Sequence, residues 1–200
     1  MHLTVKYLLP ALFFLVTLLA TTGIEAQFSR QDTLRGTVGP ERSWWDVQRY
    51  DISVTPDFDR RSIRGRNRIE YRVLPGRKSD YLQIDLQRPL EIDTIFFDDK
   101  LYINYPGKPY YNDGNVWHIP LPKAEAGSVH SITLVYHGVP RPAVNPPWDG
   151  GWIFKKDAKG RPWMTVACQG LGASVWYPCK DHQSDEPDRG ATLSMTVPDT

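Results

Sequence analysis

The sequence predicts an all-β domain, either an antiparallel sandwich or a saddle-shaped sheet, preceded by a cleaved signal peptide. Several segments alternate apolar and polar residues with a period of two, which is typical of half-buried strands. Turn-forming pairs that contain glycine separate these segments. The chain also has 17 Pro, 7 Trp, 10 Tyr and 7 Phe among its 200 residues. Proline interrupts helices and aromatic residues favour strands. No window of about 11 residues after residue 26 shows helical periodicity.

The first 26 residues predict a signal peptide. Lys6 precedes an apolar run from Tyr7 to Ala20, and Ile24-Glu25-Ala26 supplies a small-residue cleavage site. The run is shorter than the roughly 20 residues that cross a bilayer as a helix, although an uncleaved membrane anchor is the alternative. We therefore expect cleavage after Ala26 and a protein that works outside the cytoplasm, in the periplasm or secreted.

Residues 27–44 are expected to form a flexible leader, because they are polar and contain Gly36, Gly39 and Pro40. The β-domain is expected to span residues 45–200 and to be truncated at its C-terminal end. Its alternating or apolar segments predict strands at 50–54, 63–73, 81–86, 91–97, 101–105, 116–119 and 129–136.

A change of composition follows His137. The stretch GVPRPAVNPPWDGGW predicts an irregular surface loop, because it is rich in proline and glycine. Strands are then predicted at 151–154 and 163–169, joined by a turn in KKDAKGRP. Residues 191–197, ATLSMTV, alternate again and predict a last strand.

The charge balance argues against a nucleic-acid partner. The chain has 24 basic and 23 acidic residues, which leaves a formal net charge of +1. Binding to nucleic acids or to anionic membranes depends on a basic surplus. The whole-chain charge therefore gives no support to either class of partner.

The segment between Cys168 and Asp188 is the densest group of side chains that could bind a metal or move protons. Its candidates are Asp181, His182, Asp185, Glu186 and Asp188. Their spacing matches no EF-hand loop, and one histidine is thin support for zinc. Loop carboxylates more often cap turns by accepting backbone N–H groups, and we favour that interpretation over a complete metal site.

No catalytic motif is found in the chain. HExxH, the P-loop and GxSxG are all absent from the sequence, so no catalytic residue and no bound cofactor are predicted within it. The stretch GLGAS predicts a tight backbone path rather than a nucleophile elbow, because Ser174 follows the second glycine. The two cysteines, Cys168 and Cys179, could pair in an oxidising compartment or remain apart, and the sequence leaves both alternatives open.

The segment TVACQGLGASVWYPCKDHQSDEPDRGATLSMTVP resembles the end of the N-terminal β-domain of the aminopeptidase N family, the gluzincin aminopeptidases. That family has an acidic or amide residue on a strand, then a structural loop with a Pro-Cys-x-Asp-Glu-Pro-like turn, then a strand that ends in Val-Pro. The positions that fit are Gln169 and, in the loop, Pro178, Cys179, Asp181, Asp185, Glu186 and Pro187. Residues 182–184 are an insertion relative to the commonest pattern, which suggests a divergent bacterial-type subgroup. The stretch RYDISVTPDFDRRSIRGRNRIEYRV is similar to the family's opening hairpin, so the resemblance covers residues 48–200.

The resemblance implies a recognition role rather than a catalytic one for this chain. In the family, the residue that matches Gln169 projects into the active-site cleft and helps to hold the free α-amine of the peptide substrate. Zinc, its ligands and the general base belong to the next domain, so the chain's expected partners are a peptide N-terminus and its own catalytic domain. The chain alone is expected to be inactive.

The alternative from another functional class is a noncatalytic secreted β-module that binds glycan or protein. Its binding surface would use exposed aromatic side chains from the tryptophan-rich part of the sequence. The candidates are Trp148, Trp152, Trp163 and Trp176, although strand alternation favours core positions for several of them.

Overall fold

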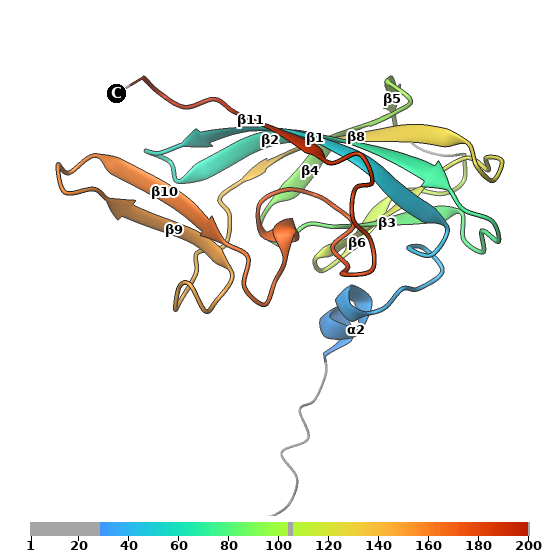
Figure 1. Ribbon diagram of the computed structural model, residues 1–200, viewed down its shortest axis with the longest axis horizontal. Coiled ribbons are helices and arrows are strands. Elements are labelled where there is room, and N and C mark those ends of the chain that lie inside the picture. Colours follow the sequence, from blue (N-terminus) through green and yellow to red (C-terminus); the bar gives the residue numbers. More distant parts are fainter. Residues whose placement is uncertain (1–28, 104–105, 200) are drawn as a thin grey trace, which may run out of the picture. The chain divides into compact units, whose positions relative to one another are not determined.

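The computed structural model describes residues 29–103 and 106–199, and within them the secondary structure is predominantly β (Figure 1). In chain order the strands of the described residues are β1 (Trp45–Asp57), β2 (Ser62–Val73), β3 (Tyr81–Asp85), β4 (Glu91–Phe97), β5 (Lys100–Tyr102), β6 (Tyr111–Asp113), β7 (Val116–Pro120), β8 (Val129–Gly138), β9 (Gly151–Lys156), β10 (Pro162–Ala167) and β11 (Ala191–Met195). An α-helix, α2 (Arg30–Gly36), precedes them, and a short 3-10 helix, η1 (Ala173–Val175), lies between β10 and β11. The predicted signal peptide, residues 1–26, lies outside the described residues.

The largest sheet has six strands in the order β11-β1-β2-β8-β4-β5. Its long strands follow from the period-two pattern of the sequence. In β2, Ile63, Gly65 and Asn67 are buried on the inner face, whereas Arg64 and Arg66 are exposed on the outer face. The predicted β-rich fold and its alternation are therefore confirmed.

The prediction of a purely antiparallel architecture is wrong at one edge of this sheet. Strand β11 runs parallel to β1, with Tyr50 beside Ala191 and Val54 beside Met195. A parallel pair needs a long crossover connection, and β11 follows the long aperiodic Cys168–Asp188 segment. Alternation along 191–197 indicated a strand and its faces, but it contains no information on the direction of pairing.

A second sheet, in the order β3-β7-β6, lies beneath the large one in the view of Figure 1. Strands β3 and β7 are almost wholly buried, and their apolar side chains join those of β1, β2, β4 and β8 in one hydrophobic cluster. Strands β9 and β10 form a separate two-stranded sheet. Trp152 of β9 belongs to the same hydrophobic cluster and connects this hairpin to the core.

The segment predicted as a flexible leader has regular structure in part. Helix α2 lies within it, and the Gln31 side chain donates a hydrogen bond to the Asp113 carbonyl oxygen and accepts one from the Asn115 N–H. Arg42 is completely buried and forms an ion pair with Asp85 of β3. These contacts come from residues far away in the sequence, so local composition could not reveal them. No helix of the described residues is long and apolar enough to span a membrane.

Candidate functional site

Gln169 lies in a tight turn that directly follows β10. The turn comprises residues 168–172 and is called the Gln169 turn below. The N–H groups of Leu171 and Gly172 both donate to the carbonyl oxygen of Cys168, at 3.2 and 2.8 Å. Gln169 is exposed, and within the described part of the chain its side-chain amide has no hydrogen-bond partner. The predicted strand 163–169 therefore ends two residues early, at Ala167, and leaves the amide group open to a ligand.

The two faces of β10 are partly as the alternation predicts. Met164 and Val166 pack against the hydrophobic core, whereas Trp163 is 49 % exposed. Cys168 would share the face of Met164 and Val166 if the strand continued to residue 169 as predicted. It is exposed instead, because the strand ends at Ala167 and the chain turns. Cys168 and Cys179 are both free thiols.

Asp181 anchors the Gln169 turn and Ser174, which follows it. The Ser174 hydroxyl donates to Oδ2 of Asp181 at 2.6 Å, and the Ser174 N–H donates to the same oxygen at 3.3 Å. Gly172 has φ of +77°, and a Cβ at this position would overlap the Asp181 carboxylate. The tight backbone path predicted for GLGAS is thus confirmed, and Asp181 is the group that requires it.

Asp181 is itself fixed to a buried ion pair. Its N–H donates to Oδ2 of Asp85 at 3.1 Å, and the same oxygen accepts a hydrogen bond from Nη2 of Arg42 at 2.5 Å. Burial raises the pKa of Asp85, and the Arg42 guanidinium opposes that shift. Nη1 of Arg42 donates to the carbonyl oxygen of Arg35 in α2 at 2.6 Å.

Helix α2 connects the Arg42–Asp85 pair to the Gln169 turn. Nη1 of Arg35 donates to the carbonyl oxygen of Gly170 at 2.5 Å. Arg35 and Asp181 therefore hold the backbone on the two sides of Leu171, and both connect to the Arg42–Asp85 pair. The exposed amide of Gln169 is presented by a turn with fixed supports, which reduces the conformational entropy lost when a ligand binds.

The beginning of the predicted structural loop pairs with buried strands. Cys179 and Asp85 exchange backbone hydrogen bonds of 2.8 and 3.1 Å, in an isolated antiparallel bridge. The Asn67 amide of β2 donates to the carbonyl oxygen of Pro178 at 2.8 Å. Burial raises the pKa of the Cys179 thiol well above its ordinary value, so this cysteine is a structural group rather than a nucleophile.

The middle of the loop is held by a buried ion pair between Lys180 and Asp185. The Lys180 ammonium also donates to the carbonyl oxygen of Trp45 at 2.5 Å and lies 4.7 Å from the centroid of the Trp45 ring. Oδ1 of Asp185 accepts the Val47 N–H at 3.3 Å. Burial lowers the pKa of Lys180, while Asp185 opposes that shift.

The end of the loop leads into β11. Oδ2 of Asp188 accepts a hydrogen bond from the Gln48 side-chain amide at 3.0 Å, and the carbonyl oxygen of Pro187 accepts the Gly190 N–H at 2.8 Å. Glu186 is exposed. The prediction that loop carboxylates accept backbone N–H groups is confirmed for Asp181 and Asp185, whereas Asp188 accepts a side-chain amide.

The tryptophan candidates divide into two pairs. Trp152 is 4 % exposed, and Trp176 packs against the core. Trp148 and Trp163 are 76 % and 49 % exposed. Core positions are therefore confirmed for two of the four residues, and the other two are on the surface.

The Arg42–Asp85 pair is the part of the site that sequence reasoning missed. A charged residue in the otherwise buried strand β3, YLQID, was a usable signal, because a buried carboxylate needs a partner. The partner itself could not be identified, since Arg42 lies in the segment that was expected to be flexible.

Comparison of the fold with solved structures gives several similar proteins. An M1 zinc metallopeptidase from Deinococcus radiodurans matches with a TM-score of 0.58 and 19 % identity, over 78 % of this chain and 33 % of that chain. A mutant of that enzyme bound to a Tyr-Ser-Ala substrate matches with a TM-score of 0.54, 19 % identity and the same coverage. Native yeast LTA4 hydrolase matches with a TM-score of 0.60 and 16 % identity, over 84 % of this chain and 27 % of that chain.

Comparison of the sequence with known proteins gives no match. No protein-family model matches the chain, and no curated protein matches it. The chain spans about a third or less of the length of the structures described above, and the match falls on their N-terminal part. This chain therefore has the fold of the N-terminal β-domain of the M1 zinc metallopeptidases.

Proposed function

We propose that this chain is the substrate-recognition domain of an M1-type zinc aminopeptidase that works outside the cytoplasm. Gln169 holds the free α-amine of a peptide substrate, and a catalytic domain of the same protein carries the zinc. That domain and the peptide N-terminus are the two partners of the chain.

The observation that carries this proposal is the exposed amide of Gln169, unpartnered among the described residues, on a turn fixed by Asp181 and Arg35. A carboxamide oxygen accepts a hydrogen bond from an ammonium group, and such a charged hydrogen bond contributes about 1.5–3 kcal/mol. The M1 fold supports the proposal. One of the similar Deinococcus structures has a Tyr-Ser-Ala substrate bound.

Zinc does not fit the residues described here. The described residues include no group of three or more His, Cys, Asp and Glu side chains placed to hold a metal. The oxygens of Asp181 and Asp188 accept hydrogen bonds from the protein's own donors, and Asp185 is buried against Lys180. In this proposal the catalytic metal belongs to the other domain, and this chain binds and orients the substrate.

The test compares the intact natural protein with residues 27–200 produced alone. We expect the intact protein to release amino acids from aminoacyl-arylamide substrates, and a chelator to abolish this activity. Residues 27–200 alone should show no release, because their sequence has no HExxH motif and the described residues hold no group of side chains placed to bind a metal. Chelator-sensitive turnover by residues 27–200, or an intact protein without aminopeptidase activity, would contradict the proposal.

Export is tested separately by sequencing the N-terminus of the mature protein. Cleavage after Ala26 gives Gln27 as the first residue of the exported chain. A protein that keeps Met1 and remains in the cytoplasm would contradict the proposed location without affecting the recognition role.

A noncatalytic binding module is the second candidate, and it is favoured by the exposure of Trp148 and Trp163. Exposed indoles can stack against sugar rings. This function predicts retention on an immobilised glycan that is lost when both tryptophans are replaced by alanine, together with an intact protein that has no peptidase activity.

A further inference from the structure

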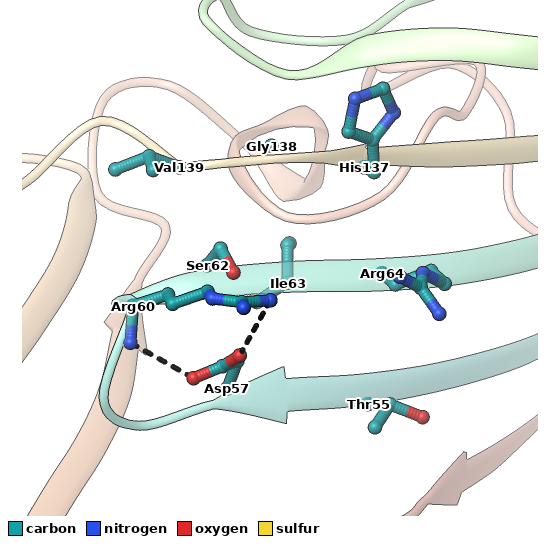
Figure 2. Close-up of a pocket in the computed structure, with 9 residues that line it drawn as sticks. All are labelled: Thr55, Asp57, Arg60, Ser62, Ile63, Arg64, His137, Gly138 and Val139. Atoms are coloured by element: carbon teal, nitrogen blue, oxygen red, sulfur yellow. Dashed lines mark hydrogen bonds and ion pairs between the residues drawn. The ribbon is translucent and has the colours of Figure 1, made fainter.

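A groove of about 450 Å³ lies at the end of the large sheet where β1 turns into β2. Its polar lining consists of Thr55, Asp57, Arg60, Ser62, Arg64 and His137 (Figure 2). Figure 2 shows β2 between β1 and β8, so three neighbouring strands form the floor of the groove. The Gln169 turn and the structural loop take no part in it.

The strand register brings three of these residues into one row. Arg64 is paired with Thr55 of β1 on one side and with His137 of β8 on the other. Directly paired residues share a face of the sheet, with Cβ atoms about 4.5–5.5 Å apart. All three are exposed on the outer face, whereas Asn67, which contacts the structural loop, is buried on the inner face.

Arg64 and Arg66 are cations without a counter-ion among the described residues. They stand two positions apart on the same face of β2, so their Cα atoms are about 6.5–7 Å apart. Arg66 is paired with Ser53 and Val135, so neither arginine has an acidic residue beside it in the sheet. Within the described part of the chain, neither has an ion-pair or hydrogen-bond partner.

The next outward arginines along the same strand show the contrasting arrangement. Arg68 lies 3.6 Å from carboxylate oxygens of both Glu70 and Asp99, and Arg72 donates to the side-chain oxygen of Gln48 at 3.0 Å. Among the described residues, Arg68 and Arg72 thus have partners, whereas the two outward arginines nearest the groove have none. Two cations on one face of a strand repel each other, so the unpartnered pair does not stabilise the fold.

The remaining charged groups of the groove are already paired. Arg60 in the hairpin turn forms an ion pair of 3.9 Å with Asp57, whose other oxygen accepts the Arg60 N–H (Figure 2). Nδ1 of His137 is hydrogen-bonded to Asp93 of β4 at 2.8 Å. The groove therefore has a positive surplus from Arg64 and hydroxyl donors from Thr55 and Ser62. Arg66 lies outside the lining and adds a second cation on the same face of β2.

We propose that this groove binds a phosphate group, with Arg64 as its principal ligand and Arg66 as its second cation. The arginine guanidinium presents parallel N–H donors that match a tetrahedral oxyanion in a bidentate way. The Thr55 and Ser62 hydroxyls complete the donor set. Free phosphate and the phosphate headgroup of a lipid share this chemistry, and the experiment below separates the two. The proposal is independent of the peptidase function.

The first measurement titrates the intact protein with inorganic phosphate by calorimetry. The variant Arg64→Gln/Arg66→Gln is expected to bind phosphate at least about tenfold more weakly than the wild type. Arg68→Gln is the control, because it removes one positive charge from the same face of the same strand, outside the groove. It is expected to bind within about twofold of the wild type. Phosphate affinity that none of these substitutions changes would place the binding elsewhere, at zinc for example, and would overturn the proposal.

The second measurement identifies the source of the phosphate. Vesicles of phosphatidylcholine with phosphatidic acid, and vesicles of phosphatidylcholine alone, are sedimented with the wild type and the double variant. Retention by the phosphatidic acid vesicles that the double variant loses assigns a lipid headgroup, whereas calorimetric binding without retention assigns free phosphate. Absence of phosphate binding, or an equal loss in Arg68→Gln and in the double variant, overturns the proposal.

Discussion

At the scale of single residues, Gly172 is a position that a larger residue cannot occupy without displacing a neighbouring side chain. Its positive φ favours glycine, and a Cβ would also overlap the Asp181 carboxylate that anchors Ser174. Gly160, in the turn between β9 and β10, has a similar φ of +79°, but a Cβ there would meet nothing within 4 Å among the described residues. The two glycines therefore separate the cost of backbone strain from the cost of losing the Asp181 contact.

We predict that Gly172→Ala lowers the free energy of unfolding more than Gly160→Ala does. Both substitutions incur the strain of a positive φ, of the order of 1–3 kcal/mol, and only Gly172→Ala also displaces Asp181. The measurement is urea unfolding of the two variants and the wild type. Equal destabilisation by the two substitutions would show that the Asp181 contact does not determine the path of the Gln169 turn.

At the scale of elements, β11 stands out because all five of its residues are exposed. Leu193 and Met195 pair in register with Ile52 and Val54, which are buried on the inner face of the sheet. The apolar inner face therefore continues onto an edge strand that remains about half exposed. An exposed apolar edge strand promotes association between chains.

We predict that residues 27–200 produced alone associate as their concentration rises, and that Leu193→Lys reduces this association. The control is Ser194→Lys, which places the same charge on the opposite face of the same strand. Sedimentation velocity over a range of concentrations measures the effect. A monomer at all concentrations, or an equal effect of both lysines, would contradict this role of the β11 inner face.

The elements also show how far the sequence predicts the fold. Strand β4 begins and ends at the predicted residues, 91 and 97, although a register shift between Ile92 and Thr94 interrupts its alternation. The direction of β11 and the three-residue strand β6 were not predictable. Pairing direction leaves no trace in alternation, and three residues are too few to show a period.

The candidate site was predictable to a similar degree. The capping carboxylates of the loop followed from the preference of such side chains for turns. The supports of the Gln169 turn were not predictable. Arg35 donates to the turn from 135 positions away in the sequence, and Arg42 acts on it through its buried partner Asp85.

At the scale of the whole molecule, four buried or half-buried tyrosines determine the response to alkaline pH. Burial raises the pKa values of Tyr50, Tyr71, Tyr136 and Tyr177 above the ordinary value of 10.0. Below pH 10 these phenols are protonated in both the folded and the unfolded chain. Above pH 10 only the unfolded chain loses their protons, so stability is lost as the pH rises.

We predict that the free energy of unfolding falls steeply above pH 10, by roughly 1.4 kcal/mol per phenol for each pH unit. Lys180, whose pKa is lowered, acts in the opposite direction. The buried Cys179 thiol, whose pKa is raised, acts in the same direction as the phenols and adds a loss that begins near pH 9. The measurement is urea unfolding at pH 8, 9, 10 and 11. Tyr136→Phe removes one of the four phenols and should therefore give a shallower fall. The substitution breaks no hydrogen bond among the described residues, because the buried Tyr136 hydroxyl has no partner there. A stability that is constant between pH 10 and 11 would contradict this account.

Gln169 is the group proposed to hold the substrate amine, and the proposed recognition role depends on it. Its matched control is Gln183, an exposed glutamine in the structural loop that lies outside the Gln169 turn. The two residues have the same side chain, so Gln169→Ala and Gln183→Ala differ only in where the amide is lost.

The most direct test is the KM of the intact protein for an aminoacyl-arylamide substrate, measured for the wild type and both variants. Gln169→Ala is expected to raise KM by about tenfold or more, because 1.4 kcal/mol corresponds to a tenfold change in affinity. Gln183→Ala is expected to leave KM within about twofold of the wild type. An unchanged KM in Gln169→Ala, or an equal rise in both variants, would contradict the recognition role of this domain.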